Sequence, residues 1–176
     1  MAEPHESQSE RPDYVGKLIG LRERLYRDTG PDRALRAQLR RCKTADDALF
    51  AGEGDAWRLV GQPKGAWFVP VMIAAIVMAH LKKTEGIKLA SKLGHDGVCS
   101  QTRFRQLLLA KDVTELLPHL RRALKLAGEA AQPHDLARSI LNWTDETKRR
   151  WAFDYFQASN ADPDVNEKSE QPSPNA

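Results

Sequence analysis

The sequence predicts an all-α fold, and three observations support that prediction. Apolar residues recur three and four positions apart along most of the 176-residue chain, which is the spacing of one face of a helix. No alternation of apolar and polar residues is long enough to indicate a strand. Ser100, Asp112 and Thr144 each stand directly before a periodic stretch, where their side chains can cap the first turn of a helix.

The first half of the chain is predicted to form helices separated by tight turns. A turn at Thr29-Gly30-Pro31 separates the first two, because proline suits the first position of a new helix. Residues 66–81 are apolar almost throughout, which indicates a buried helix, and this run is short for a membrane span of about 20 residues. The expected helices cover about residues 15–25, 31–41, 48–50, 56–60, 67–82 and 87–93.

Gly94-His95-Asp96-Gly97 interrupts the helical pattern, because two glycines around an aspartate favour a turn or hinge. We therefore predict two small helical lobes, residues 13–94 and 95–158, joined at this Gly-rich turn. Within the helix that follows Asp112, Pro118 predicts a kink or a restart. The helices expected in the second lobe follow Ser100, Asp112, Pro133 and Thr144.

Both ends of the chain are polar and acidic, and we expect residues 1–12 and 159–176 to be disordered because they cannot bury enough apolar surface. The polar start does not have the pattern of a signal peptide. The two ends carry formal charges of −2 and −3, so removing them from a chain of +3 leaves +8 on residues 13–158. Such a basic core favours a polyanionic partner such as nucleic acid or anionic lipid. The alternative is a basic surface that is merely solvated.

Basic side chains form four clusters in the predicted helices. Arginine outnumbers lysine, and its planar guanidinium group suits bidentate contacts with phosphate. The four tryptophans lie on apolar faces and are interpreted as core residues, so no base-stacking platform is indicated. The expected recognition is therefore electrostatic and insensitive to base sequence. The clusters are Arg33, Arg36, Arg40 and Lys43 with Arg41; Arg103 and Arg105; Arg121, Arg122 and Lys125; and Lys148, Arg149 and Arg150.

The sequence contains none of the common motifs for catalysis or cofactor binding. Glycine-rich phosphate loops, the HExxH zinc motif and the GxSxG nucleophile motif are missing, and no two of the five histidines stand four residues apart. His80 ends the apolar stretch and is interpreted as a packed or capping side chain. Cys42 and Cys99 have no CxxC spacing, so we interpret them as apolar fillers in a reducing cytoplasm. We expect no enzymatic activity, metal, cofactor or membrane contact.

Six short motifs occur in order along the chain. They are Leu39-Arg-Arg-Cys42, Ala56-Trp-Arg-Leu-Val60, Thr102-Arg-Phe-Arg-Gln-Leu-Leu-Leu-Ala110, Leu120-Arg-Arg-Ala-Leu124, Leu136-Ala-Arg-Ser-Ile-Leu-Asn-Trp143 and Trp151-Ala-Phe-Asp-Tyr-Phe156. Each motif is short and degenerate, but their order and spacing together resemble the CasB family, the small subunit of the type I-E CRISPR surveillance complex Cascade. The resemblance covers about residues 15–156.

The resemblance implies a two-lobed, all-helical, non-catalytic subunit of a ribonucleoprotein. Two copies would lie head to tail against the backbone subunits and the large subunit of Cascade. They would help to hold the paired crRNA and the displaced single-stranded DNA, which stabilises the R-loop. Arg41, Arg103 and Arg122 match basic positions of the family pattern and are predicted to contact nucleic acid. Residues 62–81 depart from the pattern, with Lys64 as their one lysine or arginine, so no contact is carried over there.

Charge alone assigns four further residues to the same site, and these are Arg40, Arg105, Arg121 and Lys125. Two other functions stay open on the sequence. A helical protein–protein adaptor would direct the basic faces toward acidic partner surfaces. A helix-turn-helix regulator would bind particular duplex sequences as a two-fold dimer.

Overall fold

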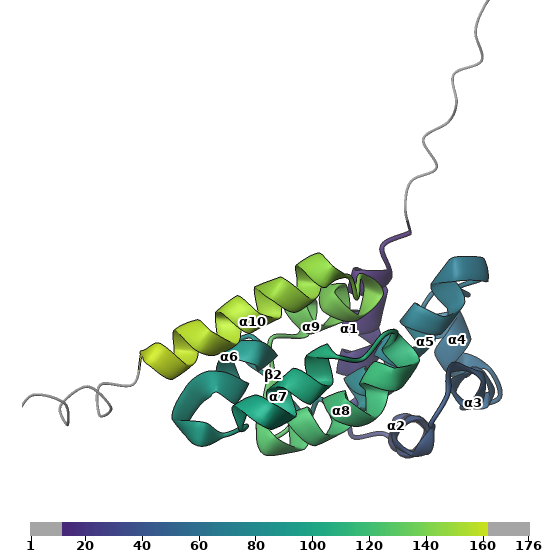
Figure 1. Ribbon diagram of the computed structural model, residues 1–176. Helices are drawn as coiled ribbons and strands as arrows, with labels where there is room; N and C mark the ends of the chain where they lie inside the picture. Colours follow the sequence, from purple (N-terminus) through teal and green to yellow (C-terminus); the bar gives the residue numbers. More distant parts are fainter. Residues whose placement is uncertain (1–11, 162–176) are drawn as a thin grey trace, which may run out of the picture.

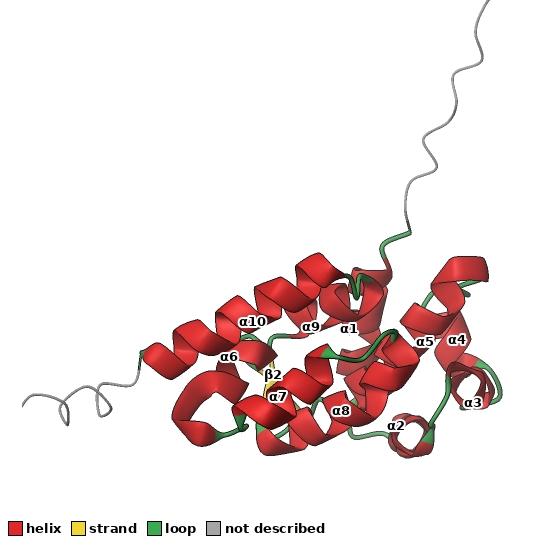
Figure 2. Ribbon diagram, viewed as in Figure 1, coloured by secondary structure: helices red, strands yellow, loops and turns green. Residues whose placement is uncertain are grey.

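Ten α-helices account for most of the described chain, which confirms the predicted all-α fold (Figures 1 and 2). The computed structural model describes residues 12–161, apart from the side chain of Asp96. The helices are α1 (Tyr14–Leu25), α2 (Gly30–Arg41), α3 (Ala45–Phe50), α4 (Asp55–Leu59), α5 (Phe68–His80), α6 (Leu89–Gly94), α7 (Gln101–Leu108), α8 (Val113–Leu126), α9 (Pro133–Leu141) and α10 (Asp145–Asn160). Two short 3-10 helices, η1 (Gly65–Trp67) and η2 (His95–Gly97), precede α5 and follow α6.

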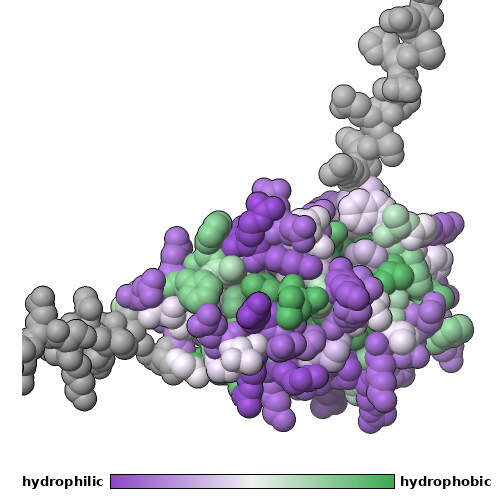
Figure 3. Space-filling model, in the orientation of Figure 1, coloured by the Kyte–Doolittle hydropathy of each residue, from purple (hydrophilic) through white to green (hydrophobic). Residues whose placement is uncertain are grey.

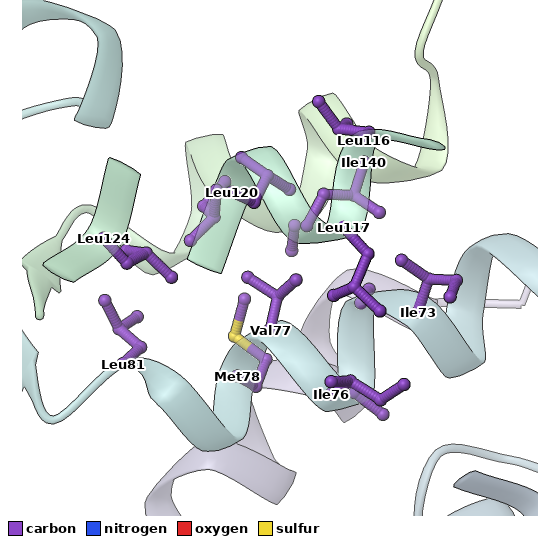
Figure 4. Packing of buried hydrophobic residues seen from close by; sticks show 14 of the residues in the cluster. Ile73, Ile76, Val77, Met78, Leu81, Leu116, Leu117, Leu120, Leu124 and Ile140 are labelled. Carbon is purple, nitrogen blue, oxygen red and sulfur yellow. The ribbon is translucent and has the colours of Figure 1, made fainter. Parts of the chain in front are cut away.

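Helix α5 lies at the centre of the core, as its almost unbroken apolar sequence predicted. Every residue from Val71 to Ala79 is fully buried, and the helix packs against α1, α2, α3, α8 and α9. Figure 4 shows Val77 and Met78 of α5 facing the leucine side chains of α8. Burying a large aliphatic side chain contributes about 1.5–3 kcal/mol, so α5 supplies a large share of the stability of the fold.

Side-chain caps fix the residues at which most of the longer helices begin. As predicted, Ser100, Asp112 and Thr144 each accept a hydrogen bond from the backbone N–H three residues further on. A cap of this kind stabilises a helix by about 1 kcal/mol, because it satisfies an N–H group that has no partner within the helix. Equivalent caps on α1, α2 and α3 come from Asp13, Thr29 and Thr44.

Helix α8 continues through Pro118, so the restart predicted at this proline does not occur. Proline removes one backbone hydrogen bond and costs about 3 kcal/mol inside a helix. Leu116, Leu117 and Leu120 flank the proline and are buried, and Figure 4 shows them among the side chains of the core. Their packing outweighs the cost of the proline and keeps α8 in one piece.

The buried core extends across the Gly-rich turn at residues 94–97. It forms one cluster that contains residues from α1–α5 and from α6–α10. A two-residue parallel bridge, β1 (Lys83–Thr84) with β2 (Ala130–Ala131), also joins the end of the α5 segment to the segment before α9. A bridge this short leaves no alternation that the sequence analysis could detect. The division into lobes at 13–94 and 95–158 stays a prediction.

The surface is mainly hydrophilic on the face that Figure 3 shows, with hydrophobic residues gathered in patches between the polar ones. Within residues 12–161, every helix is too short or too polar to cross a bilayer. The disorder predicted for residues 1–12 and 159–176 concerns segments that lie outside the described residues, except for Pro12 and residues 159–161. Of these, Ser159 and Asn160 form the end of α10.

Candidate nucleic-acid interface

The seven basic residues predicted to bind nucleic acid fall into three groups in the structure. Three of them line one groove between two helices. Two are held by contacts within the protein. The remaining two are exposed but line no groove. The groups are Arg103, Arg122 and Lys125; Arg40 and Arg121; and Arg41 and Arg105.

The first group lies in a groove of about 540 Å³ between α7 and α8, which we call the α7–α8 groove. Its apolar residues come from both helices and from the turn before α7, and the cations Arg103, Arg122 and Lys125 stand beside them. Among the described side chains that line the groove, none is a carboxylate. Its residues are Cys99, Arg103, Gln106, Leu107, His119, Arg122, Ala123, Lys125 and Leu126.

Helical spacing explains why these side chains meet. His119, Arg122 and Lys125 are three residues apart and therefore share one face of α8. The opposite face of α8 carries the leucines that pack against α5, so the burial of that face turns the cations toward solvent. On α7, Arg103 and Gln106 share a face in the same way, and α7 packs against α8.

The electrostatics of the α7–α8 groove favour an anion. Arg103, Arg122 and Lys125 are exposed, and none of them forms an ion pair with any other side chain that the structure describes. Burial and the charge of Arg122 lower the pKa of His119, which favours the neutral form of this side chain. Burial likewise raises the pKa of the Cys99 thiol, which stays protonated. Three positive charges without an ion-pair partner among the described side chains suit the phosphates of a nucleic-acid backbone.

Arg121 is a structural residue. Its guanidinium Nε donates to Nε2 of His80 at 3.1 Å, and its Nη2 donates to the carbonyl oxygens of Arg40, at 3.1 Å, and of Cys42. These contacts join α8 to the end of α5 and to the turn after α2. They confirm His80 as a packed side chain, and they leave Arg121 half-buried and committed to the fold rather than to a ligand.

Arg40 is also bound within the protein. Its Nη2 lies 3.0 Å from Oε1 of Glu129, and Lys82 pairs with the other oxygen of the same carboxylate. Although burial opposes ionisation of this carboxyl, hydrogen bonds from Lys82 and Arg40 lower the pKa of Glu129. One carboxylate thus compensates two cations, which reduces the positive charge that Arg40 can offer to a ligand.

A second basic depression, of about 580 Å³, lies where α2 meets the segment after α5. Arg36 stacks over the ring of Tyr26, with its guanidinium carbon 4.7 Å from the ring centre, and donates to the carbonyl oxygen of Leu25. Arg33 and Arg36 belong to a predicted basic cluster but not to the predicted site. Lys82 and Lys83 lie outside every predicted cluster, although two lysines directly after a buried helix are a detectable signal. The depression is lined by Tyr26, Arg33, Arg36, Ala37, Arg40, Lys82 and Lys83.

The described residues offer few other side-chain groups that could form a metal or reactive site. Between residues 12 and 161, no three side chains of His, Cys, Asp or Glu lie close enough together to hold a metal ion. Cys42 and Cys99 are both free and buried, in agreement with their interpretation as apolar fillers. The α7–α8 groove is therefore the best-supported candidate site in this part of the chain.

Comparison with known proteins gives one match. A family model described as CRISPR-associated protein Cse2 matches residues 35–156, which is most of the chain. The matched range begins in α2, ends in α10 and includes both helices of the α7–α8 groove. Comparisons with curated proteins and with solved structures found no match.

Proposed function

This chain belongs to the CRISPR-associated Cse2 family, which is the CasB small subunit of type I-E Cascade, and we propose that it binds single-stranded nucleic-acid backbone in its α7–α8 groove. The observation that carries the proposal is the set of three exposed cations, Arg103, Arg122 and Lys125, in a groove to which the described side chains contribute no carboxylate. Arg41 and Arg105 are exposed as well, and they extend the same proposal to secondary contacts outside the groove.

Within Cascade, the proposed role is to hold backbone while the R-loop forms. Exchange of a DNA duplex for an RNA–DNA heteroduplex is nearly balanced in free energy, so a few phosphate contacts can tip it. The chain would work in the cytoplasm without catalysis, beside the other Cascade subunits and a second copy of itself. Three contacts alone bind weakly, which fits a subunit whose neighbours supply the rest of the channel.

The test compares two triple variants that remove the same charge. One carries Arg103→Ala, Arg122→Ala and Lys125→Ala, and its control carries alanine at three exposed cations outside both basic depressions. Affinity for a fluorescent single-stranded DNA is measured by anisotropy across a salt series. Each lost phosphate contact changes the slope of log K against log salt by about 0.7, so the groove variant should lose a slope of about 2. The control positions are Arg27, Lys64 and Arg149.

Equal slopes for the two triple variants would overturn the assignment of the α7–α8 groove. Circular dichroism establishes that both variants fold, so that a loss of affinity reports the surface. A wild-type chain without affinity for nucleic acid at moderate salt would support the adaptor instead. Preference for one duplex sequence would support the helix-turn-helix regulator.

A further inference from the structure

The chain carries a polyanion of its own, directly after α10. Residues 162–176 contain four acidic residues and one lysine, a formal charge of −3, whereas residues 13–158 carry +8. We call residues 162–176 the acidic tail. Its acidic residues are Asp162, Asp164, Glu167 and Glu170.

The helix that leads into the acidic tail packs beside one end of the α7–α8 groove. The hydroxyl of Tyr155 donates to the carbonyl oxygen of Cys99 at 2.7 Å, and Cys99 lines the groove. One turn further along α10, Ala158 lies against Gly94 at the end of α6. Figure 1 shows the last turns of α10 on the same side of the molecule as α6. The acidic tail therefore begins close to the groove.

The length of the tail is sufficient for it to reach the groove. Ala161, the residue after α10, follows Tyr155 by six positions, which is a rise of about 9 Å along the helix axis. The 15 residues that follow can span at most about 50 Å when fully extended. Even a return along the whole length of α7, about 12 Å for eight residues, is well within this limit.

We propose that the acidic tail docks in the α7–α8 groove of its own chain and competes there with nucleic acid. Its carboxylates would pair with Arg103, Arg122 and Lys125, and Val165 would meet the apolar side of the groove formed by Leu107 and its neighbours. The competition rests on the proposed function, but the docking itself does not.

The α7–α8 groove suits the tail better than the second basic depression does. In that depression, Arg40 and Lys82 share Glu129, and Arg33 lies 3.4 Å from Asp28. Arg36 is stacked on Tyr26. In the α7–α8 groove, by contrast, the three cations have no acidic partner among the side chains that the structure describes.

Attachment to α10 makes a weak contact effective. A short tether holds its segment at an effective concentration of about 1 mM, so a contact with a millimolar or tighter dissociation constant is occupied much of the time. A long polyanion with several phosphates would displace it. The tail would thus weaken single-stranded DNA binding by about 3- to 10-fold and would discourage stray binding to cellular polyanions.

Docking is tested first without nucleic acid. Amide NMR spectra of the ¹⁵N-labelled full chain are compared with those of a tail-neutral variant, which carries Asp162→Asn, Asp164→Asn, Glu167→Gln and Glu170→Gln. At about 50 mM salt, we expect the shift changes to concentrate in α7 and α8 and to be independent of protein concentration. Shift changes that grow with protein concentration would assign the tail to a second copy and overturn the proposal, as would unchanged α7 and α8 signals. The control replaces Glu3, Glu6 and Glu10 by glutamine and should leave α7 and α8 unchanged.

Competition is tested next by affinity for single-stranded DNA. The tail-neutral variant should bind single-stranded DNA about 3- to 10-fold more tightly than the wild-type chain at low salt. The control variant, with glutamine in place of Glu3, Glu6 and Glu10, should gain less affinity. The gain should vanish in the background of the groove triple variant. An equal gain in affinity for the tail-neutral variant and for the control variant would overturn the proposed competition. Tail-dependent NMR shifts in a chain that does not bind DNA would instead uphold docking and refute the proposed function.

Discussion

At the scale of single residues, Arg121 and Arg122 show how adjacent arginines take different roles. Arg122 is exposed and lines the α7–α8 groove. Arg121, one position earlier and about 100° around the helix, donates to three acceptors on the other side of α8. The sequence could locate both charges, but it could not separate these roles, because the acceptors come from residues 40 to 80.

Replacement of Arg121 by alanine should destabilise the fold. The change leaves two carbonyl oxygens and the His80 ring without their donor, and each such loss costs about 1–3 kcal/mol when the group is buried. Because Arg121 is half-buried, we expect the free energy of unfolding in urea to fall by about 2–3 kcal/mol. The free energy of unfolding of the matched Arg122→Ala variant should stay within about 0.5 kcal/mol of the wild-type value. Similar losses for both variants would contradict the structural role of Arg121.

His80 should make stability depend on pH. Burial, with the nearby charges of Arg121 and Arg40, lowers the pKa of His80 from 6.5 to about 4. Between these values the unfolded chain binds a proton that the folded protein does not, so the free energy of unfolding should fall as the pH drops from about 6.5 to 4. His80→Gln keeps an acceptor for Arg121 but does not titrate. Its free energy of unfolding, measured in urea across this range, should therefore fall less than that of the wild type, and equal losses would refute this role.

At the scale of elements, the contact between α6 and α10 depends on a glycine. A Cβ atom on Gly94 would lie 2.1 Å from the carbonyl oxygen of Tyr155, which is far inside contact distance. The sequence identified the glycine as part of a turn, since paired glycines favour turns. Glycine is required here because α10 approaches closely at Tyr155, which follows Gly94 by 61 residues. A contact over that separation could not be inferred locally.

Gly94→Ala should therefore destabilise the protein, by about 2 kcal/mol or more, because α6 and α10 must move apart. Gly20→Ala is the matched control, since Gly20 lies on the exposed side of α1 and a Cβ atom there meets nothing within 4 Å. Alanine is the better helix former, so the control should gain about 0.5–1 kcal/mol. Thermal unfolding of the two variants measures the change in stability of each. A Gly94→Ala variant as stable as the wild type would contradict the close approach of α6 and α10.

Most helices could be predicted because the residues that determine them are close together in the sequence. The candidate site could not be predicted in the same way. Apolar periodicity and the side chains of Ser100, Asp112 and Thr144 determine where helices run and begin. The groove depends instead on which face of α7 meets α8, and the pairing of Arg40 depends on Glu129, which follows it by 89 residues. The clustering of basic residues therefore predicted the three cations of the groove, but it could not separate them from Arg40 and Arg121, which are bound within the protein.

At the scale of the whole molecule, the shared core should make unfolding a single event. Helix α5 of the first half packs against α8 and α9 of the second, so neither half can open without exposing its apolar residues. We expect one calorimetric transition with equal calorimetric and van't Hoff enthalpies. Two separable transitions would instead support two lobes, 13–94 and 95–158, that unfold independently.

The position of α5 also has a consequence during synthesis. This helix leaves the ribosome before α8 and α9 do, and Ile140 of α9 follows His80 by 60 residues. At about 5–20 residues per second, Ile140 emerges roughly 3–12 s after the end of α5, and for that time the side of α5 that α8 and α9 cover in the folded protein stays exposed. During that interval the unfinished chain is at its greatest risk of aggregation. Chaperones that bind exposed apolar segments would then bind α5.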